Sequence, residues 1–188
     1  MPGLKKPVRR ILVIIRQANG DVLLSSPVIN ALKANYPQAS IDLVVNETTV
    51  SMAESLLHIS KIYAYCYSWR KKGLFYRLFK EAQLFIRLWK KYDLAISLTA
   101  SDRDVFLAVT SGRYSIAQVE EGLKKSWWKK AFLDQQYYLE NDRHIVLNNL
   151  KTLAALGISP QSIEVTCKVD PILKEAMHRR LKNLGIDR

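Results

Sequence analysis

Strand-like and helix-like segments alternate along this chain, and that alternation restricts its fold more than any other feature. Short β-branched or apolar runs typical of strands occupy residues 11–15, 41–45, 62–65, 94–98, 114–117 and 163–169. Helical spacing of apolar residues marks residues 21–36, 48–57, 74–91, 102–110, 143–156 and 171–184. Repeated strand–helix units predict an α/β domain in which a doubly wound, Rossmann-like parallel sheet carries helices on both faces.

Length and charge narrow the class of protein further. The chain has 188 residues, enough for one domain that folds without disulfides or metal. Its 29 Lys and Arg against 17 Asp and Glu give a net charge of +12. Such an excess favours an anionic partner, which could be nucleic acid, acidic lipid headgroups or phosphorylated sugars. Two cysteines without a CxxC pair, and apolar runs too short to span a membrane, predict a cytoplasmic protein that is soluble or peripheral to a membrane.

The junction after the first predicted strand is the expected place for a site, because ligands of open α/β sheets bind beyond the carboxyl ends of the strands. Residues 16–21 contain neither a GxGxxG dinucleotide fingerprint nor a P-loop, so we expect no bound nucleotide cofactor at this turn. They do contain Gly20 followed by Asp21. Asp21 has two interpretations: a residue that caps a helix, or a general base that points into the crevice.

Several segments carry a family resemblance. Residues 10–16 and 20–24, with Pro27, Tyr36-Pro37 and residues 41–44, resemble the N-terminal signature of the lipopolysaccharide heptosyltransferases of glycosyltransferase family 9. The resemblance continues through residues 92–99 and 144–158, and the stretch 125–130 is similar to a basic, Trp-containing segment of the heptosyltransferase III group. It therefore extends over nearly the whole chain.

This resemblance implies a two-domain GT-B glycosyltransferase of which the chain is the N-terminal half. Residues 1–170 would form the acceptor-binding domain, and residues 171–188 a helix that leads towards a missing C-terminal nucleotide-sugar domain. The implied reaction transfers heptose from ADP-heptose to the inner core of lipopolysaccharide with inversion, and Asp21 is the implied catalytic base. ADP-heptose would be the donor substrate, with no cofactor and no metal. Because the donor half is missing, we expect the fragment alone to be inactive.

Further residues are candidates for contact with an acceptor that combines lipid A with Kdo and heptose. Beside the first strand these are Arg16, Asn19 and Gly20, and near the ends of later elements they are Arg103, Arg143 and His144. The basic segment adds Lys125, Trp127, Trp128 and Lys129, which either touch an anionic membrane or a sugar, or pack inside the protein. Two departures from the family pattern, Ser97 and Ala117-Gln118, blur the acceptor specificity.

Two questions stay open at the level of sequence. The segment 74–91 is a basic amphipathic helix, which either lies in a membrane interface or covers the sheet with its apolar side. The positive charge also fits a nucleic-acid-binding module, although no helix-turn-helix, RRM, KH or zinc-finger pattern is present. An inactive, truncated fragment is a third interpretation of the chain.

Overall fold

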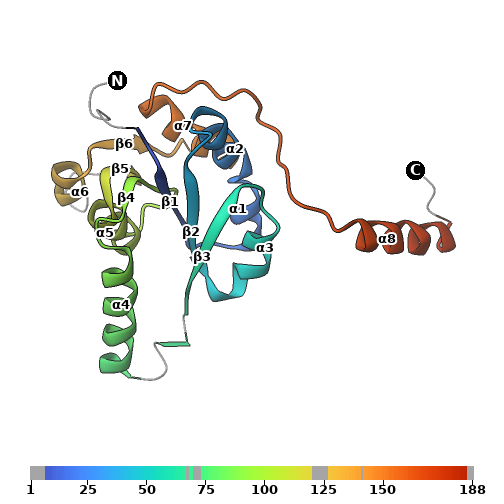
Figure 1. The fold of residues 1–188 in the computed structure, drawn as a ribbon, viewed down its shortest axis with the longest axis horizontal. Helices are drawn as coiled ribbons and strands as arrows, with labels where there is room; N and C mark the ends of the chain where they lie inside the picture. Colours follow the sequence, from blue (N-terminus) through green and yellow to red (C-terminus); the bar gives the residue numbers. More distant parts are fainter. Residues whose placement is uncertain (1–6, 67, 70–72, 120–126, 141, 186–188) are drawn as a thin grey trace.

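Six parallel strands form one sheet in the computed structural model, which describes residues 7–66, 68–69, 73–119, 127–140 and 142–185 (Figure 1). The strands are β1 (Arg10–Ile15), β2 (Ser40–Asn46), β3 (Ile59–Tyr65), β4 (Tyr92–Ser97), β5 (Gly112–Val119) and β6 (Gln135–Tyr138). Their spatial order is β3-β2-β1-β4-β5-β6. The predicted doubly wound parallel sheet is confirmed, and β1 lies inside it between β2 and β4.

Helices cover both faces of this sheet. One face packs against α1 (Asn19–Leu23), α2 (Ser26–Asn35), α3 (Val50–Glu54) and α7 (Ile145–Ala155), and we call it the α2/α7 face. The other, the α4/α5 face, packs against α4 (Leu74–Leu88) and α5 (Asp102–Ser111). The short helix α6 (Trp127–Phe132) lies beside α5, and the 3-10 turn η1 (Glu47–Thr49) precedes α3.

Strand β1 shows how the apolar residues divide between the two faces. Ile11, Val13 and Ile15 belong to the hydrophobic cluster of the α2/α7 face. Leu12 and Ile14 belong to the cluster of the α4/α5 face. Successive side chains of a strand point to opposite faces, so an unbroken apolar run is what a central strand covered on both sides requires.

The helix predicted over residues 21–36 is divided in two. Helix α1 ends at Leu23, and α2 begins at Ser26 with a proline in its first turn. The Ser25 hydroxyl donates to the carbonyl of Val22 at 2.6 Å, which satisfies part of the end of α1. Pro27 has no backbone N–H, so it starts a helix readily but cannot continue one.

The strand predicted over residues 163–169 is wrong. This segment runs along the surface without strand pairing, and side chains of α2 hold it. The Thr166 backbone N–H donates to the Ser26 hydroxyl at 3.0 Å, and the Asn30 amide donates to the Thr166 hydroxyl at 2.8 Å. The sequence pattern missed β6 instead, because Gln-Gln-Tyr-Tyr lacks the apolar alternation of a typical strand.

The last helix, α8 (Pro171–Asn183), stands away from the sheet domain at the end of this extended segment (Figure 1). Its predicted start is confirmed, since the Asp170 carboxylate accepts from the backbone N–H of Ile172 at 2.8 Å and Pro171 opens the helix. Every residue of α8 is exposed. Among the described residues, no helix is both long enough and apolar enough to span a bilayer.

Candidate active site

The turns after β1 and β4 lie next to each other at the carboxyl edge of the sheet. Strands β1 and β4 are paired up to Ile14 and Ser97, and the backbone N–H of Leu98 donates to the carbonyl of Ile14 at 3.0 Å. The segments that follow, which begin at Arg16 and Thr99, therefore face the same opening. This is the position at which open α/β sheets bind ligands.

An ion pair between Arg16 and Asp104 joins the two turns. Asp104 is only 2% exposed, and its Oδ1 atom pairs with Nε of Arg16. Its Oδ2 atom accepts from the hydroxyl of Thr99 at 2.6 Å and from that of Ser101 at 2.9 Å. Both carboxylate oxygens are thus satisfied, which is the condition under which a buried charge is tolerated.

Tyr65, the last residue of β3, extends this network towards α4. The guanidinium of Arg16 lies 4.3 Å from the centre of the Tyr65 ring, within the range of a cation–π contact. The Tyr65 hydroxyl donates to Glu81 Oε1 at 2.6 Å, and Arg103 donates to the same hydroxyl at 3.3 Å. Burial, assisted by the bond to Glu81, raises the pKa of Tyr65 above its usual value, so the phenol stays a proton donor at neutral pH.

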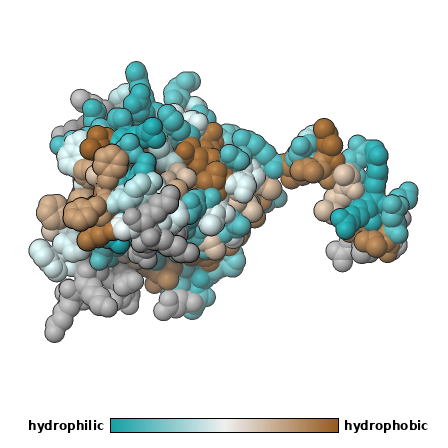
Figure 2. Space-filling view, turned by 90° about the horizontal axis from the view of Figure 1, so that it is seen from below, coloured by the Kyte–Doolittle hydropathy of each residue, from teal (hydrophilic) through white to brown (hydrophobic). Residues whose placement is uncertain are grey.

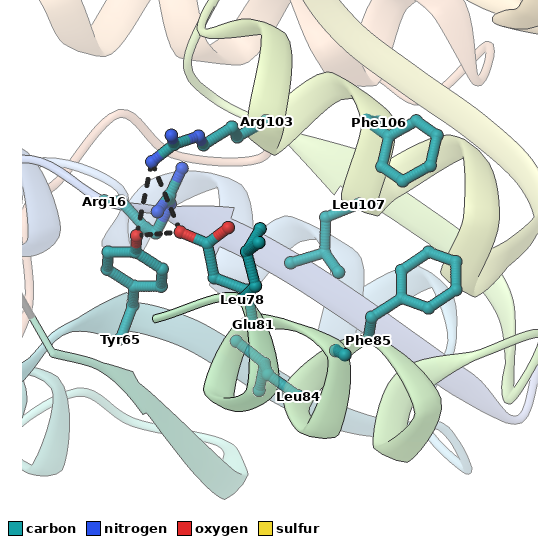
Figure 3. Close-up of a pocket in the computed structure, with 10 residues that line it drawn as sticks. Arg16, Tyr65, Leu78, Glu81, Leu84, Phe85, Arg103, Phe106 and Leu107 are labelled. Carbon is teal, nitrogen blue, oxygen red and sulfur yellow. Dashed lines mark hydrogen bonds and ion pairs between the residues drawn. The ribbon is translucent and has the colours of Figure 1, made fainter. Parts of the chain in front are cut away.

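Two cavities flank Arg16. The first, of about 300 Å³, opens between α4 and α5. Its lining residues are Arg16, Tyr65, Leu78, Glu81, Ala82, Leu84, Phe85, Arg103, Phe106 and Leu107. Figure 3 shows the polar side chains joined to one another on one side of this cavity and the apolar ones gathered on the other. The second, of about 370 Å³, is lined by Arg16, Gln17, Thr99, Ala100, Ser101, Asp104 and Gln118.

Asp21 lies at the same edge, in the first turn of α1. It is the third residue of that helix, and Ala18 rather than Asp21 occupies the N-cap position. Its Oδ2 atom nevertheless accepts from the Ala18 backbone N–H at 3.2 Å, so the carboxylate stabilises the helix start from inside the turn. Asp21 is half-buried, and Oδ1 makes no hydrogen bond with any described residue. Asn19 and Gly20 are exposed in the same turn.

The other predicted acceptor residues fall in different places. Arg103 joins the cluster, since it also pairs with Glu81 at 3.3 Å and its side chain is 43% exposed. Arg143 is exposed and pairs with Glu140 at 2.5 Å, while His144 caps α7 by accepting from the Val146 N–H at 3.3 Å. These last two follow β6, which β4 and β5 separate from β1, so the structure does not bring them to Arg16.

The basic segment is only partly a surface feature. Lys129 is 3% exposed, and its ammonium group donates to the Ala100 carbonyl at 2.6 Å and pairs with Asp102 at 2.7 Å. The expectation that Lys129 contacts a membrane or an acceptor is therefore corrected: its charge is used inside the domain to tie α6 to the turn after β4. Trp127 is 68% exposed and Trp128 is half-buried, and Lys125 lies outside the described residues.

Sequence reasoning missed Tyr65, Glu81 and Asp104, which complete the cluster. A local signal existed for Asp104, because Thr99, Ser101 and Asp104 form a short polar group immediately after a buried strand. Tyr65 and Glu81 had no such signal, since the fold alone brings β3 and α4 to Arg16. In the described part of the chain, no group of three or more His, Cys, Asp and Glu side chains could hold a metal ion.

Comparison with known proteins agrees with this arrangement. No protein-family model matches the chain. The chain is 31% identical over 170 residues to lipopolysaccharide heptosyltransferase 3 of Escherichia coli strain K12, a match that covers 89% of the chain and 48% of that protein. It is 27% identical over 173 residues to an Escherichia coli protein of the same name, covering 89% of the chain and 49% of the relative. The chain thus spans about half the length of these curated relatives.

Solved structures share the fold. A glycosyl transferase family 9 protein from Veillonella parvula DSM 2008 superposes with a TM-score of 0.71 at 20% identity, covering 95% of this chain and 50% of the other. The E. coli ADP-heptose lps heptosyltransferase II gives 0.67 at 16% identity, covering 92% and 50%. E. coli heptosyltransferase WaaC with ADP-2-deoxy-2-fluoro heptose gives 0.66 at 16% identity, covering 83% and 51%.

Fold and matches together define the class, which is the Rossmann-like N-terminal half of a GT-B glycosyltransferase. More particularly, the chain is identified as a relative of the lipopolysaccharide heptosyltransferases of glycosyltransferase family 9, and it resembles heptosyltransferase 3. The resemblance expected from residues 10–44 and 92–158 is confirmed.

Proposed function

We propose that this chain is the acceptor-binding half of an enzyme that transfers heptose from ADP-heptose to the inner core of lipopolysaccharide. The observation that carries the proposal is the 31% identity to lipopolysaccharide heptosyltransferase 3 over 89% of the chain. The cluster at the carboxyl edge of the sheet supports it, because that edge is where an open α/β domain receives a ligand. A basic nucleic-acid-binding module is not favoured, since the relatives are heptosyltransferases.

Asp21 is the catalytic base of this proposal. An acceptor hydroxyl attacks the anomeric carbon of the heptose from the side opposite ADP, which leaves with the bonding electron pair and gives inversion. The hydroxyl proton passes to a carboxylate, which needs one oxygen free to receive it. The geometry around Asp21 supports that role, because Oδ2 is held by the Ala18 N–H while Oδ1 is left for the substrate.

Arg103, Asn19 and Gly20 are the proposed acceptor contacts. Arg103 keeps part of its guanidinium exposed beside the cavity between α4 and α5, where it can bind a carboxylate or phosphate group of the acceptor. Gly20 adds no side chain to the turn, and a Cβ built on it would meet nothing within 4 Å. Arg16 has a positioning role, because its guanidinium is already engaged by Asp104 and Tyr65.

The donor site belongs to a second domain in this proposal. Residues 1–170 form the acceptor-binding domain, and the helix after residue 171 leads to a C-terminal domain that holds the nucleotide sugar. The chain alone is then inactive, and the reaction needs no cofactor or metal beyond the donor substrate. The chain spans about half of its curated relatives, which supports this division.

The proposed location is the cytoplasmic side of the inner membrane, where the enzyme binds peripherally. The net charge of +12 supports attachment to anionic lipids, since a basic residue near such a surface contributes about 1 kcal/mol. The acceptor is itself a phosphorylated glycolipid in this proposal, so the enzyme and its acceptor meet at the same surface.

Turnover of ADP-heptose tests this function. The complete polypeptide that contains this chain should release ADP in the presence of lipopolysaccharide core acceptors that lack one heptose, and it should form a product one heptose heavier by mass spectrometry. The chain alone should do neither. Absence of turnover with every such acceptor, together with salt-dependent binding to duplex or single-stranded DNA, would favour the nucleic-acid-binding alternative instead.

A further inference from the structure

Helix α4 turns much of its apolar surface outwards. Leu88 is its only fully buried side chain. Exposed fractions are 88% for Phe75, 63% for Phe79 and 71% for Ile86. The expectation that α4 covers the sheet with its apolar side is therefore met only at its C-terminal end.

The exposed residues form one stripe along the helix. At 100° per residue, Phe75, Phe79 and Ile86 project in nearly the same direction, and Leu78 and Leu74 flank them, 48% and 59% exposed. We call these five residues the outer stripe of α4. In Figure 2 brown and tan side chains gather on the side of the molecule where α4 lies in Figure 1.

The apolar surface continues from α4 onto α5. The Phe85 ring stacks on Phe106 with ring centres 5.6 Å apart, and Phe106 is 51% exposed. Trp89, 46% exposed, packs against Phe85 with ring centres 4.7 Å apart. A contiguous apolar surface of this kind on a folded domain marks an interaction site more often than a plain solvent face.

Positive charge borders this surface. Helix α4 carries Arg77, Lys80 and Arg87 against one acid, Glu81, and Lys90 and Lys91 follow the helix. Arg77 and Glu81 pair with each other at 3.7 Å, so the charges left along this edge are cationic. Such an edge repels the same edge of a second copy, whereas it attracts an anionic surface.

We infer that α4 is a membrane-docking helix whose outer stripe enters the interface of an anionic bilayer. A helix with one strongly apolar side, flanking cations and aromatic residues lies in the plane of the interface, with its apolar side at the boundary between headgroups and acyl chains. Lys80, Arg87 and Lys91 then contact lipid phosphates. This inference deepens the peripheral attachment proposed above, and it assigns that attachment to one helix.

The position of α4 links docking to the proposed site. Glu81, in the middle of the helix, contacts both Tyr65 and Arg103 at the carboxyl edge of the sheet. A bilayer against the outer stripe therefore lies beside the opening that contains Arg103. A glycolipid acceptor anchored in that bilayer would present its sugars to the site without leaving the membrane.

Co-sedimentation of the 188-residue chain with lipid vesicles tests the inference. The vesicles contain phosphatidylglycerol and phosphatidylethanolamine, and vesicles of phosphatidylcholine alone are the comparison. The double variant Phe75→Ser/Phe79→Ser should lower partitioning onto the anionic vesicles by about tenfold or more, because two exposed rings no longer enter the interface. Its thermal unfolding should match that of the unchanged chain, since neither side chain is buried.

Helix α8 supplies the matched control. Ile172 and Leu173 are 77% and 67% exposed on another basic helix, so Ile172→Ser/Leu173→Ser removes comparable apolar surface. This variant should bind the anionic vesicles like the unchanged chain. Equal losses in both double variants, or full binding by the α4 variant, would overturn the assignment to α4.

Two further arms separate the remaining outcomes. Arg87→Gln/Lys91→Gln should weaken binding to anionic vesicles and leave the weak binding to phosphatidylcholine unchanged. If the chain dimerises in sedimentation equilibrium and Phe75→Ser/Phe79→Ser abolishes the dimer without changing vesicle binding, the stripe is an interface between copies and the inference is wrong. Failure of heptose transfer leaves these binding results unaffected, so the two proposals fail separately.

Discussion

The two faces of the sheet are built differently although they share the same strands. On the α2/α7 face the helices bury their apolar residues, among them Val28, Ile29 and Leu32 of α2, against the strands. On the α4/α5 face the hydrophobic cluster is small, and α4 contributes one fully buried residue, Leu88. Polar contacts supplement that face, notably around Asp104 and Glu81. The first face accounts for the stability of the fold, and the second leaves apolar and charged groups available for a partner.

Removal of the Asp104 carboxylate should have the largest effect on stability. In Asp104→Ala the buried guanidinium of Arg16 loses its ion partner, and the hydroxyls of Thr99 and Ser101 lose their acceptor. A buried pair broken on one side costs about 3–5 kcal/mol in the free energy of unfolding. Urea denaturation followed by circular dichroism measures this. A loss below about 1 kcal/mol would mean that the polar cluster does not stabilise the α4/α5 face.

Truncation within the α2/α7 face should cost somewhat less. Leu32 is fully buried, and Leu32→Ala should lower the free energy of unfolding by about 2–5 kcal/mol through lost burial and the remaining cavity. The matched change on the other face is Leu88→Ala, which removes the one fully buried side chain of α4. Hydrogen exchange should show that it releases α4 locally while the strands keep their protection. Uniform loss of protection would contradict the contrast between the faces.

The smallest effect concerns the two thiols. Burial, with a hydrogen bond to Glu47, raises the pKa of Cys66 to about 11, whereas Cys167 is exposed in the extended segment before α8. A raised thiol pKa favours the protonated form, so at pH 8.5 Cys66 has little thiolate and should react slowly. Iodoacetamide labelling followed by mass spectrometry should modify Cys167 first, and Cys66 should become reactive only as the pH approaches 11. Equal rates at pH 8.5 would be inconsistent with this environment.

Sequence patterns predicted the parts of the fold that depend on local chemistry. The continuous apolar run of β1 and the Asp170-Pro171 start of α8 follow from neighbouring residues, and both are confirmed. The break between α1 and α2 and the surface path of residues 163–169 depend on contacts made only after folding, such as the bond of Thr166 to Ser26. Strand propensity cannot tell pairing with a sheet from hydrogen bonding to a helix, because both leave the chain extended.

The candidate site divides in the same way. The position of Asp21 and Arg16 after the first strand follows from the strand–helix alternation together with the rule for open α/β sheets. The burial of Lys129 could not be predicted, because its partners Ala100 and Asp102 come from another turn of the fold. The outward orientation of the α4 stripe was equally hidden, since an amphipathic sequence does not say which side meets the sheet.

The role of Asp21 is tested most directly by ADP release from the complete protein with a heptose-acceptor core oligosaccharide. Asp21→Asn keeps an oxygen that can accept the Ala18 N–H but cannot take a proton. The control is Asp93→Asn, which makes the same change at the opposite edge of the sheet, where Asp93 accepts from the backbone of Arg9 and Arg10 at 3.0 and 3.1 Å.

We expect Asp21→Asn to lower kcat by about 100-fold or more with an unchanged melting temperature, and Asp93→Asn to retain turnover. Turnover by Asp21→Asn at the rate of the unchanged enzyme would contradict the account and place the base elsewhere.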